Sequence, residues 1–283
     1  MQALRNSTRH SLFSSVSLAM AEVLQGAAER VVMPRFRRLA ETDIEEKSPG
    51  ELVTTADREA EEMIANGLAA INSSARFVGE EACAREPSAL RNLDKGEVWI
   101  VDPIDGTGNY ASGRSPFALM AALVQDGETI AACILDPVGG ILTLAERGSG
   151  AWINGQRLSA RRAVKHLNSC TGIVSNFQRP RTMEAQVAGL TALAAQVLPS
   201  QRCAGAEYPL VASGVRDFAL YWRTLVWDHA PGVLILEEAG GKAARLDGTP
   251  YRPSDPNGAI LLSHSPEIWA QVAAKLSNQP QPL

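Results

Sequence analysis

Hydrophobic residues near the N-terminal end of the chain recur every three or four positions. The recurring positions include Leu12, Val16, Met20, Leu24, Ala27 and Val31. Because this spacing puts them on one face of a helix, we expect an amphipathic helix that runs to about Pro34. Residues 41–50 are polar and end in proline and glycine, which predicts a loop. We expect a short strand-like piece at 52–57 and a helix over 58–71 to follow.

The middle of the chain alternates short apolar runs with turn residues. The runs cover residues 98–101, 117–125, 129–135, 141–146 and 151–153. Asp126-Gly127 and Asn154-Gly155 are dipeptides that favour two-residue β-hairpin turns. The middle third therefore predicts a series of antiparallel strands packed by helices, an α+β arrangement.

In the last part of the chain, strand-like pieces alternate with Ala-rich helical stretches. The strand-like pieces lie at 172–175 and 210–213, and a helical stretch lies between them at 182–198. We therefore expect two domains, an N-terminal α+β domain over residues 1–155 and a C-terminal α/β domain over residues 156–283.

The composition of the 283 residues, 45% hydrophobic and 20% charged, is that of a soluble globular protein. A net charge of −4 gives no reason to expect nucleic acid or an anionic membrane as a partner. No apolar run approaches the ~18 residues of a membrane span. The four cysteines lie far apart without a C-x-x-C pair, which favours reduced thiols and a cytoplasmic location over a zinc knuckle or a disulfide framework.

The beginning of the chain has a composition similar to that of a transit peptide. It contains Arg5, Arg9 and several serines, and no acidic residue precedes Glu22. The apolar part, residues 12–20, is interrupted by serines and is too weak for the hydrophobic segment of a secretion signal. A removable targeting segment over about the first 20 residues therefore stays open beside the predicted helix.

Candidate chemistry is concentrated where the apolar run at 98–101 ends. The chain continues there as Asp102-Pro-Ile-Asp105-Gly-Thr107-Gly-Asn109-Tyr110. The proline fixes φ and stiffens the turn, so both carboxylates can point into one space and hold divalent metals. Gly106 lets the backbone approach a ligand, and free N–H groups at the start of a following helix attract phosphate. Taken alone, an Asp/Pro/Gly turn is also a common structural feature.

The whole run is far more specific than the turn. Its seven specified residues, Asp, Pro, Ile, Asp, Gly, Thr and Asn, match a given start position by chance with a probability on the order of 10⁻⁹. The run resembles the D-P-I-D-G-T-x-N-[FY] signature of the inositol monophosphatase family, of the magnesium-dependent, lithium-sensitive phosphatase superfamily. The resemblance implies a layered α-β-α-β-α sandwich of the inositol monophosphatase and fructose-1,6-bisphosphatase type. It also implies a homodimer with two to three Mg²⁺ ions per subunit.

Three further segments resemble blocks of the same family. Asp57 ends an L-V-T-x-x-D block, Glu80 is the first glutamate of a G-E-E block, and Asp228 lies in a W-D-x-A block. From the residues alone, Asp57 and Asp228 favour helix N-caps and Glu80 favours a solvated turn. The resemblance instead places all three at the metals. His229, which follows Asp228, is expected to be structural.

Carboxylates without His or Cys form the oxygen-rich set that Mg²⁺ prefers. The metal ligands that the resemblance implies are Glu80, Asp102, the carbonyl of Ile104, Asp105 and Asp228. Asp102 would bridge two ions, and a third would contact Glu80 and Asp57 through waters. By the same resemblance, Thr107, aided by Asp57 or Glu80, orients and helps deprotonate a water for in-line attack on phosphorus.

The substrate positions follow the family less closely. The residues expected to bind substrate are Gly106 and Thr107, through their N–H groups, and Gly205, Ala206, Glu207, Tyr221 and Arg223. Inositol-specific members have an acidic residue seven positions before the aspartate of the second signature, and this chain has Tyr221 there. Glu207 either replaces that acid or is an ordinary surface charge, and Arg223 would suit a second anionic group.

Together these features predict a Mg²⁺-dependent phosphomonoesterase for a small phosphorylated polyol, sugar or amino alcohol. Inositol monophosphate, histidinol phosphate and fructose 1,6-bisphosphate stay open as substrates. A non-catalytic, metal-binding regulatory protein is the alternative from another class, because a set of metal ligands does not by itself establish turnover.

Overall fold

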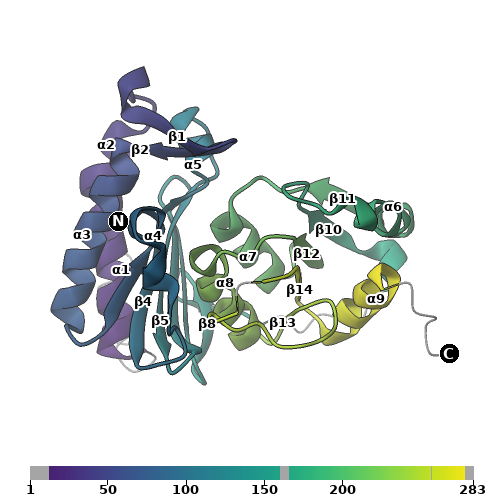
Figure 1. The fold of residues 1–283 in the computed structure, drawn as a ribbon. Coiled ribbons are helices and arrows are strands. Elements are labelled where there is room, and N and C mark those ends of the chain that lie inside the picture. Colours follow the sequence, from purple (N-terminus) through teal and green to yellow (C-terminus); the bar gives the residue numbers. More distant parts are fainter. Residues whose placement is uncertain (1–12, 160–165, 256, 278–283) are drawn as a thin grey trace.

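The computed structural model describes residues 13–159, 166–255 and 257–277 (Figure 1). Its helices and sheets alternate as five layers. Helices cover one face of a seven-stranded sheet, a second pair of helices lies between that sheet and a five-stranded sheet, and further helices cover the outer face of the smaller sheet. The predicted α-β-α-β-α sandwich is confirmed.

The first layer contains the helix predicted from the N-terminal pattern. It consists of α1 (Ser15–Ala27), the π-helical turn η2 (Ala28–Val32) and α2 (Met33–Arg35), and it packs on α3 (Thr55–Ile71) and on the large sheet. Met20 and Leu24 are fully buried, and the Ser17 hydroxyl donates to Glu146 of the sheet at 2.7 Å. Ser17 and Met20, within the segment whose removal the sequence left open, are thus buried in the core, whereas residues 1–12 lie outside the described residues.

The large sheet is antiparallel apart from its first pair of strands. In spatial order its strands are β3 (Arg76–Gly79), β4 (Glu97–Asp105), β5 (Ala118–Gln125), β6 (Glu128–Asp136), β7 (Ile141–Glu146), β8 (Gly150–Ile153) and β9 (Gln156–Arg157). Asp126 and Asn154 have φ of 47° and 48°, as the predicted two-residue hairpin turns require. The run of antiparallel strands expected in the middle third is confirmed.

The small sheet mixes parallel and antiparallel pairs. Its strands, in spatial order, are β11 (Gln196–Pro199), β10 (Thr171–Val174), β12 (Phe218–Tyr221), β14 (Ile260–Ser263) and β13 (Lys242–Ala244). Its outer helices are α6 (Glu184–Leu193) and α9 (Pro266–Leu276), with the short 3₁₀ turns η5 (Leu167–Ser169) and η6 (Arg181–Met183) beside them.

The middle layer consists of α7 (Ala204–Ala212) and α8 (Val226–Glu238). Both helices pack on the large sheet and on the small one, and a single buried cluster includes Met120 of β5, Leu234 of α8 and Leu262 of β14. The large sheet ends at Arg157 and the small sheet starts at Thr171. The division into domains at residue 155 stays a prediction, since helices from the second half of the chain are shared by both sheets.

Three local predictions are wrong. The loop expected at 41–50 contains the turn η3 (Glu41–Asp43) and β1 (Ile44–Ser48), which forms a hairpin with β2 (Glu51–Thr54); β1 has no apolar alternation to reveal it. The helix expected at 182–198 stops at Leu193 and gives way to β11. The strand-like piece at 210–213 is the end of α7, because a short apolar run fits a buried helix equally well.

Short helices join the strands that carry the candidate site. They are α4 (Glu80–Arg85) and η4 (Pro87–Leu90) between β3 and β4, and α5 (Thr107–Ala111) after β4. Among the residues that the structure describes, no helix combines the length and the apolar character needed to cross a membrane.

Candidate functional site

β4 brings two aspartates to one point because its pairing is interrupted beside Pro103. The pairing with β5 is regular up to Asp102 and shifts before Asp105. Proline has no N–H for the ladder, and the N–H of Ile104 donates to Oδ1 of Asp102 at 3.0 Å. Gly106, with φ of 85°, then turns the chain into α5, a conformation that favours glycine.

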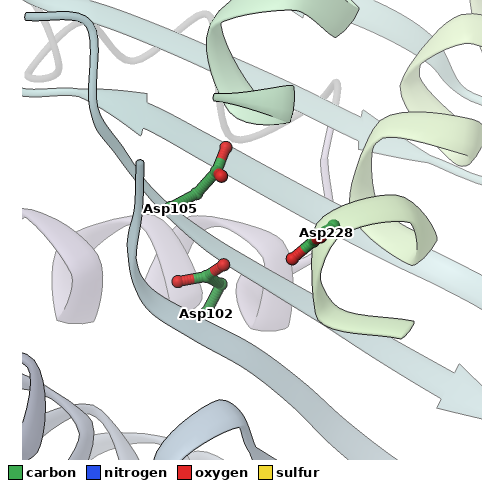
Figure 2. A group of neighbouring side chains, drawn as sticks. All are labelled: Asp102, Asp105 and Asp228. Atoms are coloured by element: carbon green, nitrogen blue, oxygen red, sulfur yellow. The ribbon is translucent and has the colours of Figure 1, made fainter. Parts of the chain in front are cut away.

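A third carboxylate comes from the middle layer. Asp228 is the third residue of α8, so the reading of it as the N-cap is wrong, and Leu225 holds that position. Figure 2 shows its side chain directed toward Asp102 and Asp105, and one oxygen of each carboxylate lies within 4.8 Å of the others. The two halves of the chain thus meet in one acidic cluster.

The environment of this cluster disfavours negative charge. Burial raises the pKa of Asp105 to about 7 and raises those of Asp102 and Asp228 well above the usual range, and the charge of Glu80 adds to this rise. Among the described residues, no Lys, Arg or His forms an ion pair with the three carboxylates. A divalent cation would supply the missing positive charge, and a donor set of oxygens alone fits Mg²⁺.

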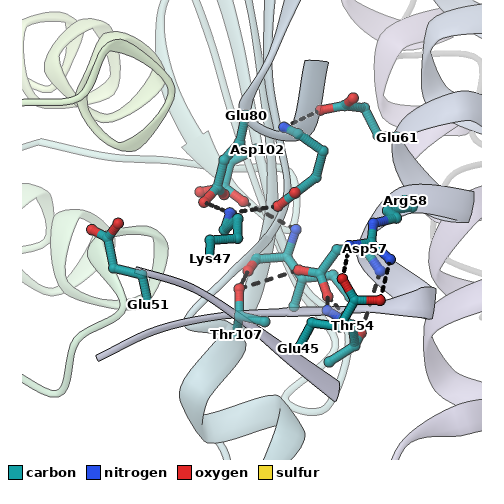
Figure 3. Close-up of polar contacts among 12 residues, drawn as sticks. Glu45, Lys47, Glu51, Thr54, Asp57, Arg58, Glu61, Glu80, Asp102 and Thr107 are labelled. Atoms are coloured by element: carbon teal, nitrogen blue, oxygen red, sulfur yellow. Dashed lines mark hydrogen bonds and ion pairs between the residues drawn. The ribbon is translucent and has the colours of Figure 1, made fainter. Parts of the chain in front are cut away.

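Asp57 and Thr107 form a hydrogen-bonded pair beside the cluster (Figure 3). The Thr107 hydroxyl lies 3.1 Å from Oδ1 of Asp57 and 3.0 Å from the carbonyl oxygen of Ile104. Asp57 is not the N-cap of α3: Thr54 is, and Oδ2 of Asp57 accepts from the Thr54 N–H at 2.8 Å in a capping box. Burial, with Glu80 and Glu81 nearby, raises the pKa of Asp57 to about 7. This carboxylate is suited to accept a proton near neutral pH.

Glu80 stands apart from the three-aspartate cluster and is bound by a lysine. Nζ of Lys47, from β1, lies 2.7 Å from Oε1 of Glu80 and 2.7 Å from Oε1 of Glu81. Although burial opposes it, the two glutamates raise the pKa of Lys47. The start of α4 is fixed by Glu61 of α3, which accepts from the Glu81 N–H at 2.8 Å. The solvated turn that the sequence favoured for Glu80 is therefore wrong.

Comparisons with known proteins agree with this geometry. Residues 14–281 match the model of the family described as "Inositol monophosphatase family". The chain belongs to this family. It is 31% identical over 233 residues to "Inositol-1-monophosphatase" of Mesorhizobium japonicum. That match covers 78% of this chain and 82% of the relative. The chain is also 31% identical over 215 residues to "Fructose-1,6-bisphosphatase/inositol-1-monophosphatase" of Thermotoga maritima, covering 72% and 75%.

A solved structure also resembles the whole chain. It is the extragenic suppressor protein suhB from Bartonella henselae, with a TM-score of 0.79 and 26% identity, and the match covers 93% of this chain and 98% of that one. As a member of the inositol monophosphatase family, the chain is a hydrolase of the phosphatase type, and the acidic cluster is suited to the family's metal dependence.

In this family member, a cavity of about 420 Å³ opens over the acidic cluster. The predicted site residues that line it are Glu80, Asp102, Asp105, Gly106, Thr107, Tyr221, Arg223 and Asp228. Asp57 and Ile104 lie behind this lining, where both contact the Thr107 hydroxyl. The cavity therefore joins the predicted metal positions to part of the predicted substrate positions.

The loop that lines the main cavity lies earlier in the chain than the predicted substrate positions Gly205 and Ala206. Gly205 and Ala206 line a separate cavity of about 310 Å³, and the N–H of Gly205 donates to Oδ2 of Asp105 at 2.5 Å. The residues that line the main cavity here are Arg202, Cys203 and Ala204. Gly205 and Ala206 were predicted to bind substrate because they resemble the family's loop motif. However, α7 starts at Ala204, so the backbone has already turned away from the cavity at Gly205.

Glu207 is buried, and the alternative of a surface charge is wrong. Its carboxylate accepts from the Gln201 N–H at 2.5 Å, from the Ser200 hydroxyl at 3.2 Å and from the Tyr221 hydroxyl. These three donors hold Glu207 behind Tyr221. Glu207 does not itself line the cavity.

His229 is fixed by two hydrogen bonds. Its Nδ1 lies 2.9 Å from the Tyr208 hydroxyl and its Nε2 lies 3.1 Å from the Arg223 carbonyl. Burial lowers its pKa to about 3, so it stays neutral, donates from Nε2 and accepts at Nδ1. These contacts fit the structural role expected for it, because they tie the start of α8 to the loop that carries Arg223.

Sequence reasoning missed Lys47, Phe177 and Arg202. Lys47 is the single basic residue in the acidic stretch 41–50, just before the L-V-T-x-x-D block. A lone lysine among glutamates is the one sequence signal that could have indicated its ion pair with Glu80. Phe177 and Arg202 lie in connections after β10 and before α7, and both line the main cavity. No pattern in the sequence separates them from ordinary loop residues.

Proposed function

We propose that the protein is a Mg²⁺-dependent phosphomonoesterase, which hydrolyses a small phosphorylated polyol, sugar or amino alcohol of the inositol 1-phosphate type to the alcohol and phosphate. The observation that carries the proposal is the meeting of two buried aspartates, Asp102 and Asp105, and the half-buried Asp228 with Thr107, hydrogen-bonded to Asp57, at one cavity. Family membership supports the reaction class.

The residues proposed to hold two to three Mg²⁺ ions are Glu80, Asp102, Asp105, Asp228 and, through its carbonyl, Ile104, with Asp57 acting through waters. When bound, such ions neutralise charge on the phosphoryl oxygens and lower the pKa of a water. Asp102, Asp105 and Asp228 have raised pKa values and form no ion pair with a described residue, which is the expected state of these three ligands without their ions.

Thr107 and Asp57 are proposed to handle the proton. A water that donates to the Thr107 hydroxyl oxygen is held with a lone pair free for attack on phosphorus. Thr107 passes its own proton to Oδ1 of Asp57, 3.1 Å away, as it accepts the proton of the water. The N–H groups of Gly106 and Thr107, at the start of α5, are proposed to bind the phosphate oxygens.

Inositol 1-phosphate, histidinol phosphate and fructose 1,6-bisphosphate form the panel that tests the proposal. Phosphate release from each is measured with about 5 mM Mg²⁺, and with EDTA as the control. We expect kcat/KM of about 10⁴ M⁻¹s⁻¹ or more for the best substrate. Fructose 1,6-bisphosphate is included because the Thermotoga maritima relative is named for both activities. If Mg²⁺ binds stoichiometrically and no phosphate is released from any member of the panel, the protein is a metal-binding regulatory protein instead.

Three properties of the family complete the proposal. They are inhibition by lithium, assembly into a homodimer and a cytoplasmic location. Phosphate release at increasing LiCl, with NaCl as the matched salt, tests the first, and sedimentation of the purified protein tests the second. Fractionation of the source cells with an antibody to the chain tests the third.

A further inference from the structure

The outer part of the main cavity has a charge opposite to that of the metal positions. Arg114, Arg202 and Arg223 line it, and the first two are exposed whereas Asp102 is buried. Among the described residues, Glu51 is the one carboxylate that pairs with any of these arginines, and it pairs with Arg223. Arg114 and Arg202, at the cavity entrance, therefore have no carboxylate partner in the part of the chain that the structure describes.

One aromatic ring orients two of these arginines. The Cζ atom of Arg202 lies 4.5 Å from the centre of the Phe177 ring, and that of Arg223 lies 4.8 Å from it. The three residues come from three different connections: after β10, before α7 and between β12 and α8. Contact with the ring face restricts each guanidinium and leaves its N–H edge available.

Most of the donors of the two guanidiniums are unused. Each guanidinium has five N–H groups. One of Arg202 donates to the Gly50 carbonyl at 3.0 Å, and one of Arg223 donates to the Glu51 carboxylate, both at the tip of the β1–β2 hairpin. No other hydrogen bond joins these two guanidiniums to a described residue. The contact with Glu51 also places an oxyanion against the edge of Arg223 within the cavity lining.

We propose that Arg202 and Arg223, held on Phe177, form a subsite for a second anionic group of the substrate. The group is a phosphate or a carboxylate at the end remote from the phosphate that is hydrolysed, since a guanidinium binds either one through paired N–H···O bonds. The inference rests on the proposed phosphatase function, and it narrows the substrate class to small phosphomonoesters that carry two anionic ends.

Fructose 1-phosphate and fructose 1,6-bisphosphate test this subsite, because they differ only in the second phosphate. Phosphate release from both is measured for the wild type and for Arg202→Met and Arg223→Met. In each variant we expect KM for the bisphosphate to rise by about tenfold to a hundredfold, the loss expected for a charge-assisted hydrogen bond, and kcat to change little. KM for fructose 1-phosphate should change less than about threefold, because it lacks the second anion.

Arg37→Met is the matched control. Like Arg202, Arg37 stacks on a phenylalanine, with Cζ 4.9 Å from the ring centre of Phe36, and donates to a glycine carbonyl at 3.0 Å, that of Gly113. It does not line the cavity, so its loss should leave both KM values unchanged.

Two results would overturn the subsite. One is an equal rise of KM for both substrates in the arginine variants, which would assign the arginines a structural role. The other is a wild-type KM that is no lower for the bisphosphate than for the monophosphate. Absence of Mg²⁺-dependent release by the wild type from the two fructose phosphates and from every other member of the panel would contradict the proposed function itself. Whenever the two fructose phosphates are not hydrolysed, calorimetric titration of the wild type and the two variants with fructose 1,6-bisphosphate decides the subsite: equal affinities overturn it.

Discussion

The Thr107 hydroxyl lies 3.1 Å from Oδ1 of Asp57, although the two residues are fifty positions apart in the chain. The other carboxylate oxygen of Asp57 accepts from both the N–H and the hydroxyl of Thr54, at 2.8 and 2.5 Å, and thereby starts α3. A helix-capping contact therefore fixes the position of the proposed proton acceptor. Because Oδ2 is used for the cap, Oδ1 is the oxygen that faces Thr107.

Thr107→Val removes the hydroxyl and keeps the shape of the side chain. We expect kcat for phosphate release to fall by about 10²- to 10⁴-fold, the range for loss of a positioned proton-transfer group, with KM changed less than about threefold. Thr107→Ser keeps the hydroxyl and should retain most of the activity. A valine variant with more than about a tenth of the wild-type kcat would show that the proton reaches Asp57 by another route.

Asp102→Asn should abolish turnover and leave the fold intact. The amide oxygen can still accept from the Ile104 N–H, but the variant loses one of the four carboxylate charges proposed to hold the ions directly. We expect phosphate release below about 1% of wild type. The metal-free variant should melt no lower than the metal-free wild type, because a repulsive charge has gone from the cluster.

Asp247→Asn is a matched control for this change. Asp247 also accepts from the N–H two residues later, that of Thr249 at 2.9 Å, but it lies on the exposed surface. Its replacement should leave phosphate release unchanged. Release by Asp102→Asn near the level of this control would remove Asp102 from the metal site.

The stability of the metal-free protein should fall as the pH rises from about 5 to about 7. Burial raises the pKa values of Asp57, Glu61 and Asp105 to about 7 in the folded state, above their values of 3.8, 4.5 and 3.8 in free peptides. The unfolded chain therefore binds fewer protons than the folded chain in this window, and the free energy of unfolding decreases with pH.

Thermal melting in EDTA between pH 5 and 7.5 measures this effect, and melting in Mg²⁺ provides the comparison. Because Mg²⁺ binds the deprotonated carboxylates, the rise of Tm that it causes should grow over the same window, to about 5 °C or more at pH 7.5. A Tm in EDTA that increases steadily from pH 5 to pH 7.5 would contradict the raised pKa values.

Tyr221→Phe should lower stability and spare catalysis. The hydroxyl of Tyr221 donates to Glu207, which is 0% exposed, so its loss leaves a buried carboxylate oxygen with one partner fewer. We expect the free energy of unfolding to fall by about 1–3 kcal/mol, measured by urea denaturation. Adding Glu207→Gln should recover part of the loss because the buried charge is then absent. A tenfold fall of kcat in Tyr221→Phe would instead place the hydroxyl in the reaction.

The sequence predicted the acidic cluster well because its three aspartates lie in short, specific blocks. Asp102 and Asp105 share one turn, and Asp228 lies beside Trp227 in a block of its own. For Asp228 the resemblance to the family block pointed to the site, although the residues alone favoured a helix N-cap. A site built from residues close together in the chain can be recognised in a sequence. The same holds for the antiparallel strands, whose apolar runs and Asp-Gly and Asn-Gly turns are local features.

The rest of the site depends on contacts between residues that lie far apart in the chain. Lys47 reaches Glu80 and Glu81 only because a strand exposed on most of its length pairs with β2. Glu207 could be a surface charge until Tyr221, fourteen positions later, is placed against it. Arg202 is defined by its distance to Phe177, which comes from another connection of the fold.

The shared middle layer sets a rule for building chimeras between members of this family. Both α7 and α8 pack between the two sheets. A crossover near residue 157 would therefore pack helices from one parent against the large sheet of the other and shift Asp228 relative to Asp102 and Asp105. Grafts confined to the connections at 176–178, 200–203 and 222–225 leave both helix faces native. To change the substrate preference, these loops should therefore be exchanged, while α7, α8 and both sheets are kept from one parent.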